Sequence, residues 1–231
     1  MTIISIFGAD GRMAQAIVAA LDEREDARIG EHRPDVYVDF TVPDAIDEHL
    51  ACALKHSKPI LIGTTGLTTD HQRAIDEAAR HVAVLQSANT SLGVNLLAHL
   101  VREAAQKLGE EWDVEIVEMH HRYKVDSPSG TALMLGKAAA EGRGVELDAV
   151  ATRGRDGITG ARKAGAIGLA SLRGGSVSGD HQVVFAAEGE RLELGHRAES
   201  RLIFARGAVE AAIWLHGKPA GRYTMADVLG L

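Results

Sequence analysis

The segment Thr2-Ile-Ile-Ser-Ile-Phe-Gly-Ala-Asp-Gly-Arg-Met13 determines how the first part of the chain folds. Isoleucine alternates with small residues up to Gly8, which predicts a buried strand followed by a turn. Residues 11–24 then carry Ile17 and Leu21 at helical spacing, so the turn opens a helix. A strand, a glycine turn and a helix in this order bring backbone amides and a helix N-terminus together, as phosphate binding requires.

The turn departs from the usual dinucleotide fingerprint, because Asp10 and Met13 occupy its second and third glycine positions. Taken alone it is compatible with a dinucleotide site or with a plain tight turn. Arg12 could pair with the 2′-phosphate of NADP. Glu31 is the best candidate for the acid that contacts the cofactor ribose, and Arg33 follows it two residues later in the chain. Glu31 also suits a plain surface position.

Strands and helices alternate through about residue 90. Strands are expected at 27–31, 35–40, 59–62 and 82–85, and helices at 43–56 and 68–81. This order predicts a parallel sheet wrapped by helices, whose strands all end at one ligand-binding edge. Gly63–Thr65 and Ser87–Thr90 would lie at that edge with the first turn, and they suit either a passing nicotinamide or an ordinary loop.

The pattern changes after residue 91. A long amphipathic helix is expected at 92–108, a period-two strand at 113–119 and a helix at 130–141, followed by strand-like runs at 147–152, 165–172, 181–188 and 190–197. A helical pattern returns at 201–216, before a docked tail at 221–229. We therefore expect one domain from 1–91 and 205–231, and a smaller mixed α/β domain with a largely antiparallel sheet from 92–204.

The composition is that of an ordinary globular protein, with 45% hydrophobic and 25% charged residues among 231. No apolar run approaches the ~18–20 residues that span a bilayer. The single cysteine, Cys52, excludes an internal disulfide and suits a packed core thiol. Lys and Arg are scattered in a chain of net charge −7, which argues against a nucleic-acid partner. These features favour the cytoplasm.

The segment Glu118-Met-His-His-Arg-Tyr-Lys-Val-Asp-Ser-Pro-Ser-Gly-Thr131 concentrates titratable groups ahead of a helix. His120, His121 and Lys124 can supply protons or positive charge to a bond that accepts a hydride. Gly130-Thr131 at the helix start can bind a carboxylate through backbone amides and a hydroxyl.

Other interpretations of this segment are weaker. A His-His pair can bind zinc, but no third ligand with suitable spacing is present, so no metal site is expected. Ser129 lacks the motif of a nucleophile, and Asp126-Ser-Pro-Ser129 also fits a helix cap. Glu118 and Asp126 are expected to orient Arg122 or Lys124 rather than to act as acids.

Glu118-x-His-His-Arg-x-Lys-x-Asp-x-Pro-Ser-Gly-Thr-Ala132 closely resembles the signature of the dihydrodipicolinate reductase family. Gly8-x-x-Gly-Arg-Met13, Asp39-Phe-Thr41, Gly63-Thr-Thr-Gly66 and Gly207-Ala-Val with Trp214-Leu support the resemblance, which covers essentially the whole chain. The chain differs in Asp10, in the short segment between its second and third strands, and in Ser87-Ala-Asn-Thr90, which lacks an aromatic residue.

The resemblance implies a Rossmann-like domain for NADH or NADPH, a substrate domain that also assembles a homotetramer, and reduction of a cyclic dicarboxylate to tetrahydrodipicolinate. It implies that His120 donates and accepts a proton, that Lys124 donates one, and that His121, Gly130 and Thr131 hold carboxylates. The cofactor would be lined by Gly8, Ala9, Asp10, Gly11, Arg12, Met13, Gly63, Thr64, Thr65, Ser87, Ala88, Asn89 and Thr90.

Two other functions stay open at this point. One is a related two-domain amino-acid dehydrogenase, against which the Pro-Ser-Gly-Thr131 anion site argues. The other is a nucleotide-sensing module without chemistry, which would have no need of His120 and Lys124.

Overall fold

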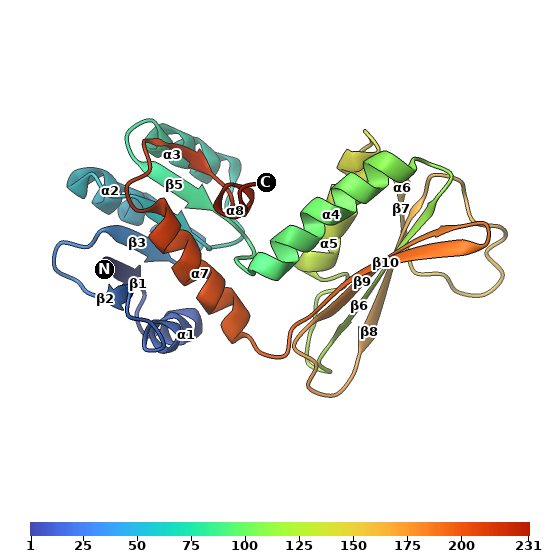
Figure 1. The fold of residues 1–231 in the computed structure, drawn as a ribbon, viewed down its shortest axis with the longest axis horizontal. Coiled ribbons are helices and arrows are strands. Elements are labelled where there is room, and N and C mark those ends of the chain that lie inside the picture. Colours follow the sequence, from blue (N-terminus) through green and yellow to red (C-terminus); the bar gives the residue numbers. More distant parts are fainter. The chain divides into compact units, whose positions relative to one another are not determined.

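The computed structural model describes residues 1–231, which form two compact units, Met1–Leu92 with Leu202–Leu231 and Gly93–Arg201 (Figure 1). Each unit has its own sheet. No helix of the chain combines the length and the hydropathy that a membrane crossing requires.

The first unit is built on a six-stranded sheet in which every pairing is parallel, in the order β11-β5-β4-β3-β1-β2. The strands are β1 (Thr2–Phe7), β2 (Ala27–Ile29), β3 (Val36–Asp39), β4 (Ile60–Ile62), β5 (Ala83–Gln86) and β11 (Gly221–Tyr223). Because they are parallel, the turns that follow β1, β3, β4 and β5 share one edge of the sheet, as the sequence predicted.

Helices cover both faces of this sheet, because successive side chains on a strand point to opposite faces. Val36 and Val38 of β3 pack in a core with α1 (Arg12–Leu21) and α7 (Leu202–Leu215), whereas Tyr37 packs in a second core. That second core includes α2 (Ile46–His56), which continues the short helix η1 (Pro43–Ala45), and α3 (Thr69–Ala79). The chain ends in α8 (Met225–Leu229). The first unit is therefore a three-layer α/β structure of Rossmann type.

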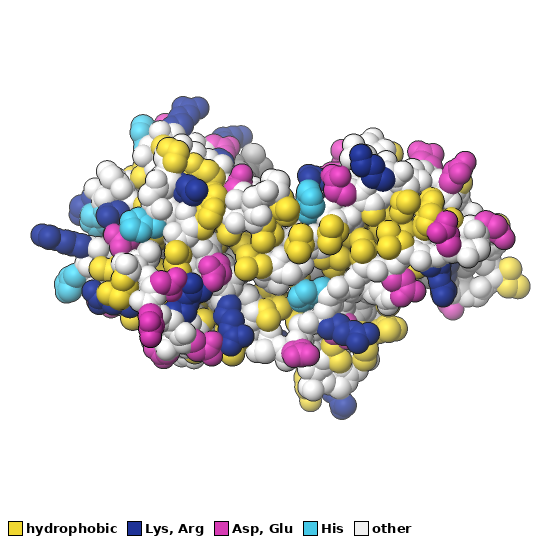
Figure 2. Space-filling view, viewed as in Figure 1, with side chains coloured by type: hydrophobic (Ala, Val, Ile, Leu, Met, Phe, Trp, Pro, Cys, Tyr) yellow, Lys and Arg dark blue, Asp and Glu magenta, His cyan; other side chains and the backbone are white.

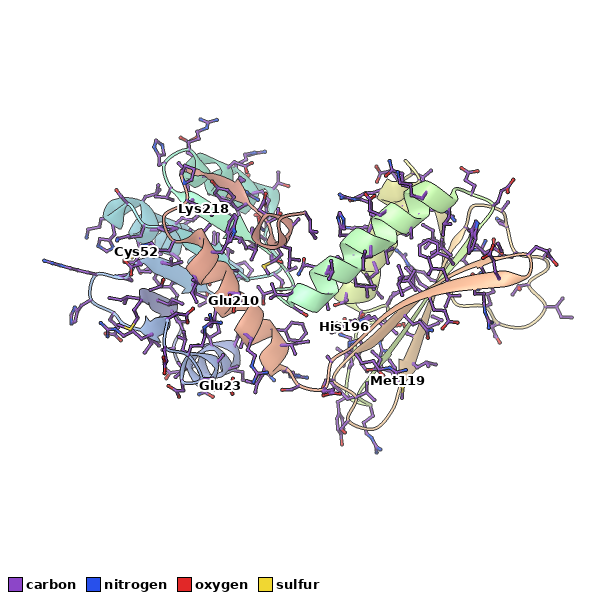
Figure 3. All side chains as sticks on the ribbon, in the orientation of Figure 1. Glu23, Cys52, Met119, His196, Glu210 and Lys218 are labelled. Carbon is purple, nitrogen blue, oxygen red and sulfur yellow. The ribbon has the colours of Figure 1, made fainter.

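Charged pairs join the end of α1 to α7. Arg206 of α7 contacts Glu23 at 2.9 Å, and Arg24 forms an ion pair with Glu210 of α7 (Figure 3). Helix α7 is thus fixed to the segment that directly follows the first helix of the same unit.

The second unit has a five-stranded mixed sheet in the order β10-β9-β6-β8-β7. Its strands are β6 (Asp113–His120), β7 (Ala151–Arg153), β8 (Ile167–Arg173), β9 (Asp180–Ala187) and β10 (Glu190–Arg197). Its helices are α4 (Leu92–Leu108), α5 (Gly130–Gly142) and α6 (Leu147–Val150). Helices α4 and α5 bury one face of the sheet in a core that includes Val101, Leu135 and Phe185.

The pairings of this sheet are half parallel: β6 pairs with β8, and β8 with β7, in parallel, while β9 pairs antiparallel with β6 and β10. The mixed domain is confirmed, with fewer antiparallel pairs than the sequence suggested. The strand expected at 147–152 is wrong in its first part, which forms α6. Leu147 packs against α5 at Gly136. It is 5% exposed, and its methyl groups lie 3.1 and 3.2 Å from the position that a Cβ on Gly136 would occupy.

The opposite face of the second sheet carries no helix. This face carries the side chains that alternate with the buried residues along each strand. They include Val117 and Met119 of β6, Leu172 of β8 and Val184 of β9. Hydrophobic side chains also run along α4, where Leu96 and Leu100 are 42% and 44% exposed (Figure 2). Lys and Arg are dispersed among Asp and Glu on the face shown.

Candidate active site

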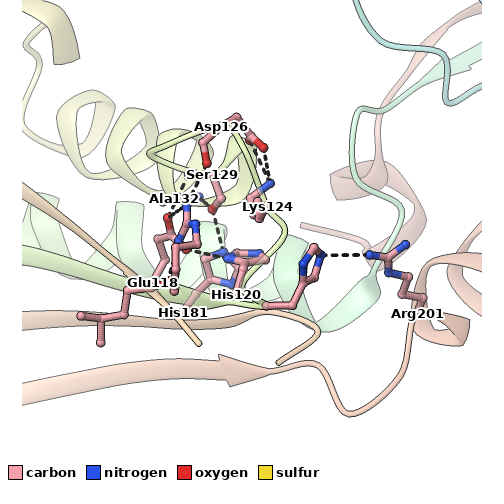
Figure 4. A network of polar contacts seen from close by, with 11 residues as sticks. Glu118, His120, Lys124, Asp126, Ser129, Ala132, His181 and Arg201 are labelled. Carbon is pink, nitrogen blue, oxygen red and sulfur yellow. Dashed lines mark hydrogen bonds and ion pairs between the residues drawn. The ribbon is translucent and has the colours of Figure 1, made fainter. Parts of the chain in front are cut away.

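His120 stands at the end of β6, on the face that packs against α5. The strand alternates in burial, so Glu118 and His120 share the covered face, with Glu118 1% and His120 9% exposed. The Nδ1 atom of His120 lies 2.5 Å from Oε2 of Glu118 (Figure 4). Because Nδ1 faces the carboxylate, the Nε2 atom is the one left for chemistry. A Cβ on Gly179 would lie 3.0 Å from Nε2, so glycine at this position leaves room beside that atom.

Glu118 is held by a second residue that the sequence did not suggest. Arg173, at the end of β8, donates to both oxygens of Glu118 at 2.8 and 2.9 Å. Burial raises the pKa of Glu118, but hydrogen bonds from Arg173, Ser171 and His120 outweigh it and lower the pKa to about 2. The expectation that Glu118 orients Arg122 or Lys124 is therefore wrong, because the strand pairing brings Arg173 to it instead.

The start of α5 lies beside this carboxylate. Ser129 is 2% exposed and caps the helix by accepting a hydrogen bond from the Ala132 amide at 3.1 Å, while its own amide donates to Glu118 at 3.3 Å. Gly130 and Thr131 form the first helical turn, where the helix dipole is positive. Nothing lies within 4 Å of a Cβ built on Gly130, so the helix start is open there.

His181 of β9 is another residue that the sequence missed. Its Nε2 lies 3.0 Å from the Ser129 hydroxyl, and its ring contacts His120 edge-on at a centroid distance of 5.1 Å. Burial, followed by the nearby charge of His120, lowers the pKa of His181 to about 4. In the neutral tautomer that carries its proton on Nδ1, His181 accepts the proton of the Ser129 hydroxyl, which leaves the lone pairs of Ser129 for capping α5.

Lys124 and His121 lie on the loop after β6. Lys124 Nζ contacts both oxygens of Asp126 at 2.8 Å, so Asp126 pairs with Lys124 and not with Arg122 (Figure 4). His121 Nε2 lies 3.2 Å from a guanidinium nitrogen of Arg201. Arg201 was also missed; its only signal in the sequence is a cation directly before the apolar helix α7.

The first turn of the other unit has the backbone that a phosphate cradle needs. Gly8 has φ +68°, and its carbonyl accepts a hydrogen bond from the Gly11 amide at 2.9 Å. Gly11 precedes α1 without a side-chain cap, and α1 has no acidic residue in its first turn. Residues 8–12 are exposed, as are Glu31 and Arg33 after β2. These features fit a bound pyrophosphate, because the uncapped amides and the helix dipole face solvent.

Two further turns at this edge are more enclosed than the sequence suggested. Thr64 is 6% exposed, and its hydroxyl donates to Asp39 at 2.9 Å. Thr90 is 1% exposed, and its hydroxyl donates to the Phe204 carbonyl at 2.7 Å. Both hydroxyls are therefore used in hydrogen bonds inside the unit, where they hold the backbone of their turns. Thr65 and Ala88 are the exposed residues of the two turns.

The comparisons with known proteins agree with the resemblance. The family profile described as dihydrodipicolinate reductase, N-terminus, matches residues 29–90, and the one described as its C-terminus matches 93–229. A 4-hydroxy-tetrahydrodipicolinate reductase from Zymomonas mobilis is 54% identical over 99% of this chain and 97% of its own length. One from Parvibaculum lavamentivorans is 62% identical over 85% of this chain and 73% of its own length.

A solved dihydrodipicolinate reductase from Paenisporosarcina sp. TG-14, with dipicolinate bound, shares the fold at a TM-score of 0.78. It is 23% identical to this chain, and 98% of each chain is covered. The profiles match more than half of the chain, and the Zymomonas relative extends that match across the Gly8 turn. The chain belongs to the dihydrodipicolinate reductase family.

Proposed function

We propose that the His120 cluster is the active site in which this chain reduces 4-hydroxy-tetrahydrodipicolinate to tetrahydrodipicolinate with NADH or NADPH, in the diaminopimelate route to lysine. One observation carries the assignment. A histidine oriented by a buried carboxylate, a lysine, a His121–Arg201 pair and an open helix start come together in one unit.

The reaction consumes one NAD(P)H and one proton and releases NAD(P)⁺ and water. The bound dinucleotide supplies the hydride. Reduction places negative charge on the atom next to the carbon that receives the hydride, so a proton donor is needed there. Lys124 is the proposed donor, and Nε2 of His120 the proposed donor and acceptor, because its Nδ1 is committed to Glu118. Glu118 and Arg173 act through His120 as positioning residues.

The two substrate carboxylates need cations and amides in an acidic protein. We assign them to His121, Gly130 and Thr131, and we add Arg201, whose guanidinium contacts His121 at 3.2 Å. A planar guanidinium suits a carboxylate, because it can donate two parallel hydrogen bonds.

The unit Met1–Leu92 with Leu202–Leu231 is proposed to hold the cofactor, and the unit Gly93–Arg201 is proposed to hold the substrate. Gly8–Met13, Gly63–Thr65 and Ser87–Thr90 would line the dinucleotide, with Glu31 at the ribose and Arg33 or Arg12 near a 2′-phosphate. Thr64 and Thr90 would contribute through their backbone, since their hydroxyls are used internally.

The bare outer face of the second sheet supports a homotetramer built through this unit. It exposes Met119, Ala170, Leu172 and Val184 around the centre of the sheet. Apolar surface of this kind is typical of a face covered by another subunit. Light scattering on the purified protein would give the mass of four chains.

We also assign the enzyme to the cytoplasm. We propose no nucleic-acid partner, since the basic residues form no stripe on the face shown in Figure 2.

The function is tested by following oxidation of NADH and NADPH with freshly generated 4-hydroxy-tetrahydrodipicolinate. Turnover is expected only when the dicarboxylate is present. Lys124→Ala should lower kcat by about 100-fold or more, the usual contribution of a positioned general acid, with dinucleotide affinity nearly unchanged. A Lys124→Ala enzyme with normal turnover would refute the role given to Lys124. An unmodified chain that does not consume the dicarboxylate would refute the function.

A further inference from the structure

Asp39, the last residue of β3, is a fully buried carboxylate without a Lys or Arg partner. It is 0% exposed. Its Oδ1 accepts from the Thr41 amide at 2.9 Å, the Thr41 hydroxyl at 2.7 Å and the Thr64 hydroxyl at 2.9 Å. Its Oδ2 lies 2.8 Å from Nδ1 of His49 on α2. A buried carboxylate is costly unless donors surround it, so these contacts form one fixed unit.

This unit reaches the Gly8 turn by way of Thr41. A Cβ built on Gly8 would lie 2.7 Å from the Thr41 methyl group, so the side chain of Thr41 rests directly on the backbone of Gly8. The Thr41 amide also donates to the Thr64 hydroxyl at 2.9 Å, which joins Thr41 to the turn after β4. The carboxylate of Asp39 thereby determines how closely Thr41 approaches the first turn.

Two aromatic contacts extend the same arrangement. The His49 ring stacks on Phe7, the residue before Gly8, at a centroid distance of 3.9 Å and an angle of 7°. Phe40 lies so close to Gly63 that a Cβ there would be 1.9 Å from the ring. The ends of β1, β3 and β4 are therefore fixed around one carboxylate.

We propose that Asp39 is a positioning residue for the dinucleotide: through Thr41, Thr64 and His49 it sets the spacing between the Gly8 turn and the Gly63 turn. The proposal rests on the cofactor assignment made above and adds a residue to it. Asp39 cannot touch the cofactor itself, because no part of it reaches solvent. Its effect is expected on dinucleotide affinity, with little effect on the dicarboxylate, whose proposed ligands lie in the other unit.

The test is a fluorescence titration of NADH into the full-length protein, with steady-state kinetics in parallel. Asp39→Leu keeps the branched shape of the side chain and removes every acceptor, and its Kd for NADH should rise at least about tenfold, equivalent to about 1.4 kcal/mol. Asp39→Asn keeps one oxygen for the three donors, so its Kd should lie between those of the wild type and Asp39→Leu. Asp47→Leu makes the same substitution at an exposed carboxylate of α2 and should leave the Kd unchanged.

A general loss of structure gives a different result. If Asp39 only stabilised the fold, kcat would fall in step with the unfolding temperature. For a positioning role, kcat at saturating NADH and the KM for the dicarboxylate should stay within about twofold of the wild type. If Asp39→Leu does not fold, Asp39→Asn and His49→Leu take its place, each with a Kd raised several-fold.

The outcomes separate the two proposals. Wild-type protein that binds NADH, with Asp39 and His49 variants that bind it equally well, overturns the inference and leaves the function standing. Wild-type protein that binds neither NADH nor NADPH overturns the proposed function and the inference with it.

Discussion

Glu118→Gln is the substitution that most directly tests how His120, the proposed catalytic histidine, is held. The change keeps the shape of the side chain but removes its charge. Glu118 is 1% exposed and accepts from Arg173, His120 and the Ser129 amide. A glutamine has one acceptor oxygen, so it cannot satisfy the two Arg173 contacts and His120 Nδ1 together.

The structure gives the size of the effect on stability. A carboxyl whose pKa falls from 4.5 to about 2 on folding contributes about 3 kcal/mol at neutral pH. Arg173 is 22% exposed and can be hydrated once its partner is lost, so we expect a loss of about 2–3 kcal/mol. Because the folded pKa is the lower one, this contribution is present above pH 4.5 and is lost as pH falls toward 2.

The effect on catalysis follows from His120. Without the carboxylate, Nδ1 is no longer fixed as the atom that faces inward, and kcat should fall by about 100-fold. The KM for NADH should not change. Urea unfolding at neutral pH measures the first effect, and NADH oxidation measures the second.

Glu115→Gln provides a matched control. Glu115 lies on the same strand, on the other face, and its carboxylate is likewise paired with arginine, in this case with Arg155 and Arg162. Its variant should keep the wild-type kcat. A Glu118→Gln enzyme with kcat within about twofold of the wild type would refute the orienting role of Glu118.

Three further predictions concern separate parts of the structure. Burial lowers the folded pKa of His181 from 6.5 to about 4, so stability should be full above pH 6.5 and fall as pH drops toward 4, by up to about 3 kcal/mol. In His181→Gln, the unfolding free energy measured with urea should depend less on pH between about 6.5 and 4.5, a range that lies above the titration of Glu118. A pH dependence equal to that of the wild type would contradict this. Gly130→Ala should leave stability nearly unchanged, because nothing lies within 4 Å of the new methyl, yet raise the KM for the dicarboxylate; equal KM values would remove Gly130 from the site. Gly63→Ala should cost about 1–3 kcal/mol and weaken NADH binding, because its Cβ would stand 1.9 Å from Phe40; thermal unfolding together with NADH titration decides this.

The elements that the sequence predicted best are those with local signals. The helix expected at 92–108 is α4, and the strand at 190–197 is β10, because a regular period needs no information from elsewhere in the chain. At the candidate site, local spacing was enough to single out His120, Lys124 and the capped start of α5.

The partners of these residues could not be predicted, because they depend on strand register. Glu118 of β6 stands opposite Ser171 on one side and His181 on the other, and Arg173 follows two residues along β8. No pattern within 118–131 specifies that register, so Arg173 and His181 were missed and Glu118 was given the wrong partners. Arg201 was missed for a similar reason, since it meets His121 across 80 positions of sequence.

The return of the chain to the first unit in α7 has a consequence for how the protein is made. Ala205, Ala208, Val209, Ala212 and Leu215 of α7 lie in the same core as the strands formed from residues 1–85. A nascent chain therefore exposes the face of these strands that α7 covers until α7 itself has left the ribosome. The segment 93–201 can complete its own core earlier. We expect the half of the molecule that is synthesised first to reach its native state last.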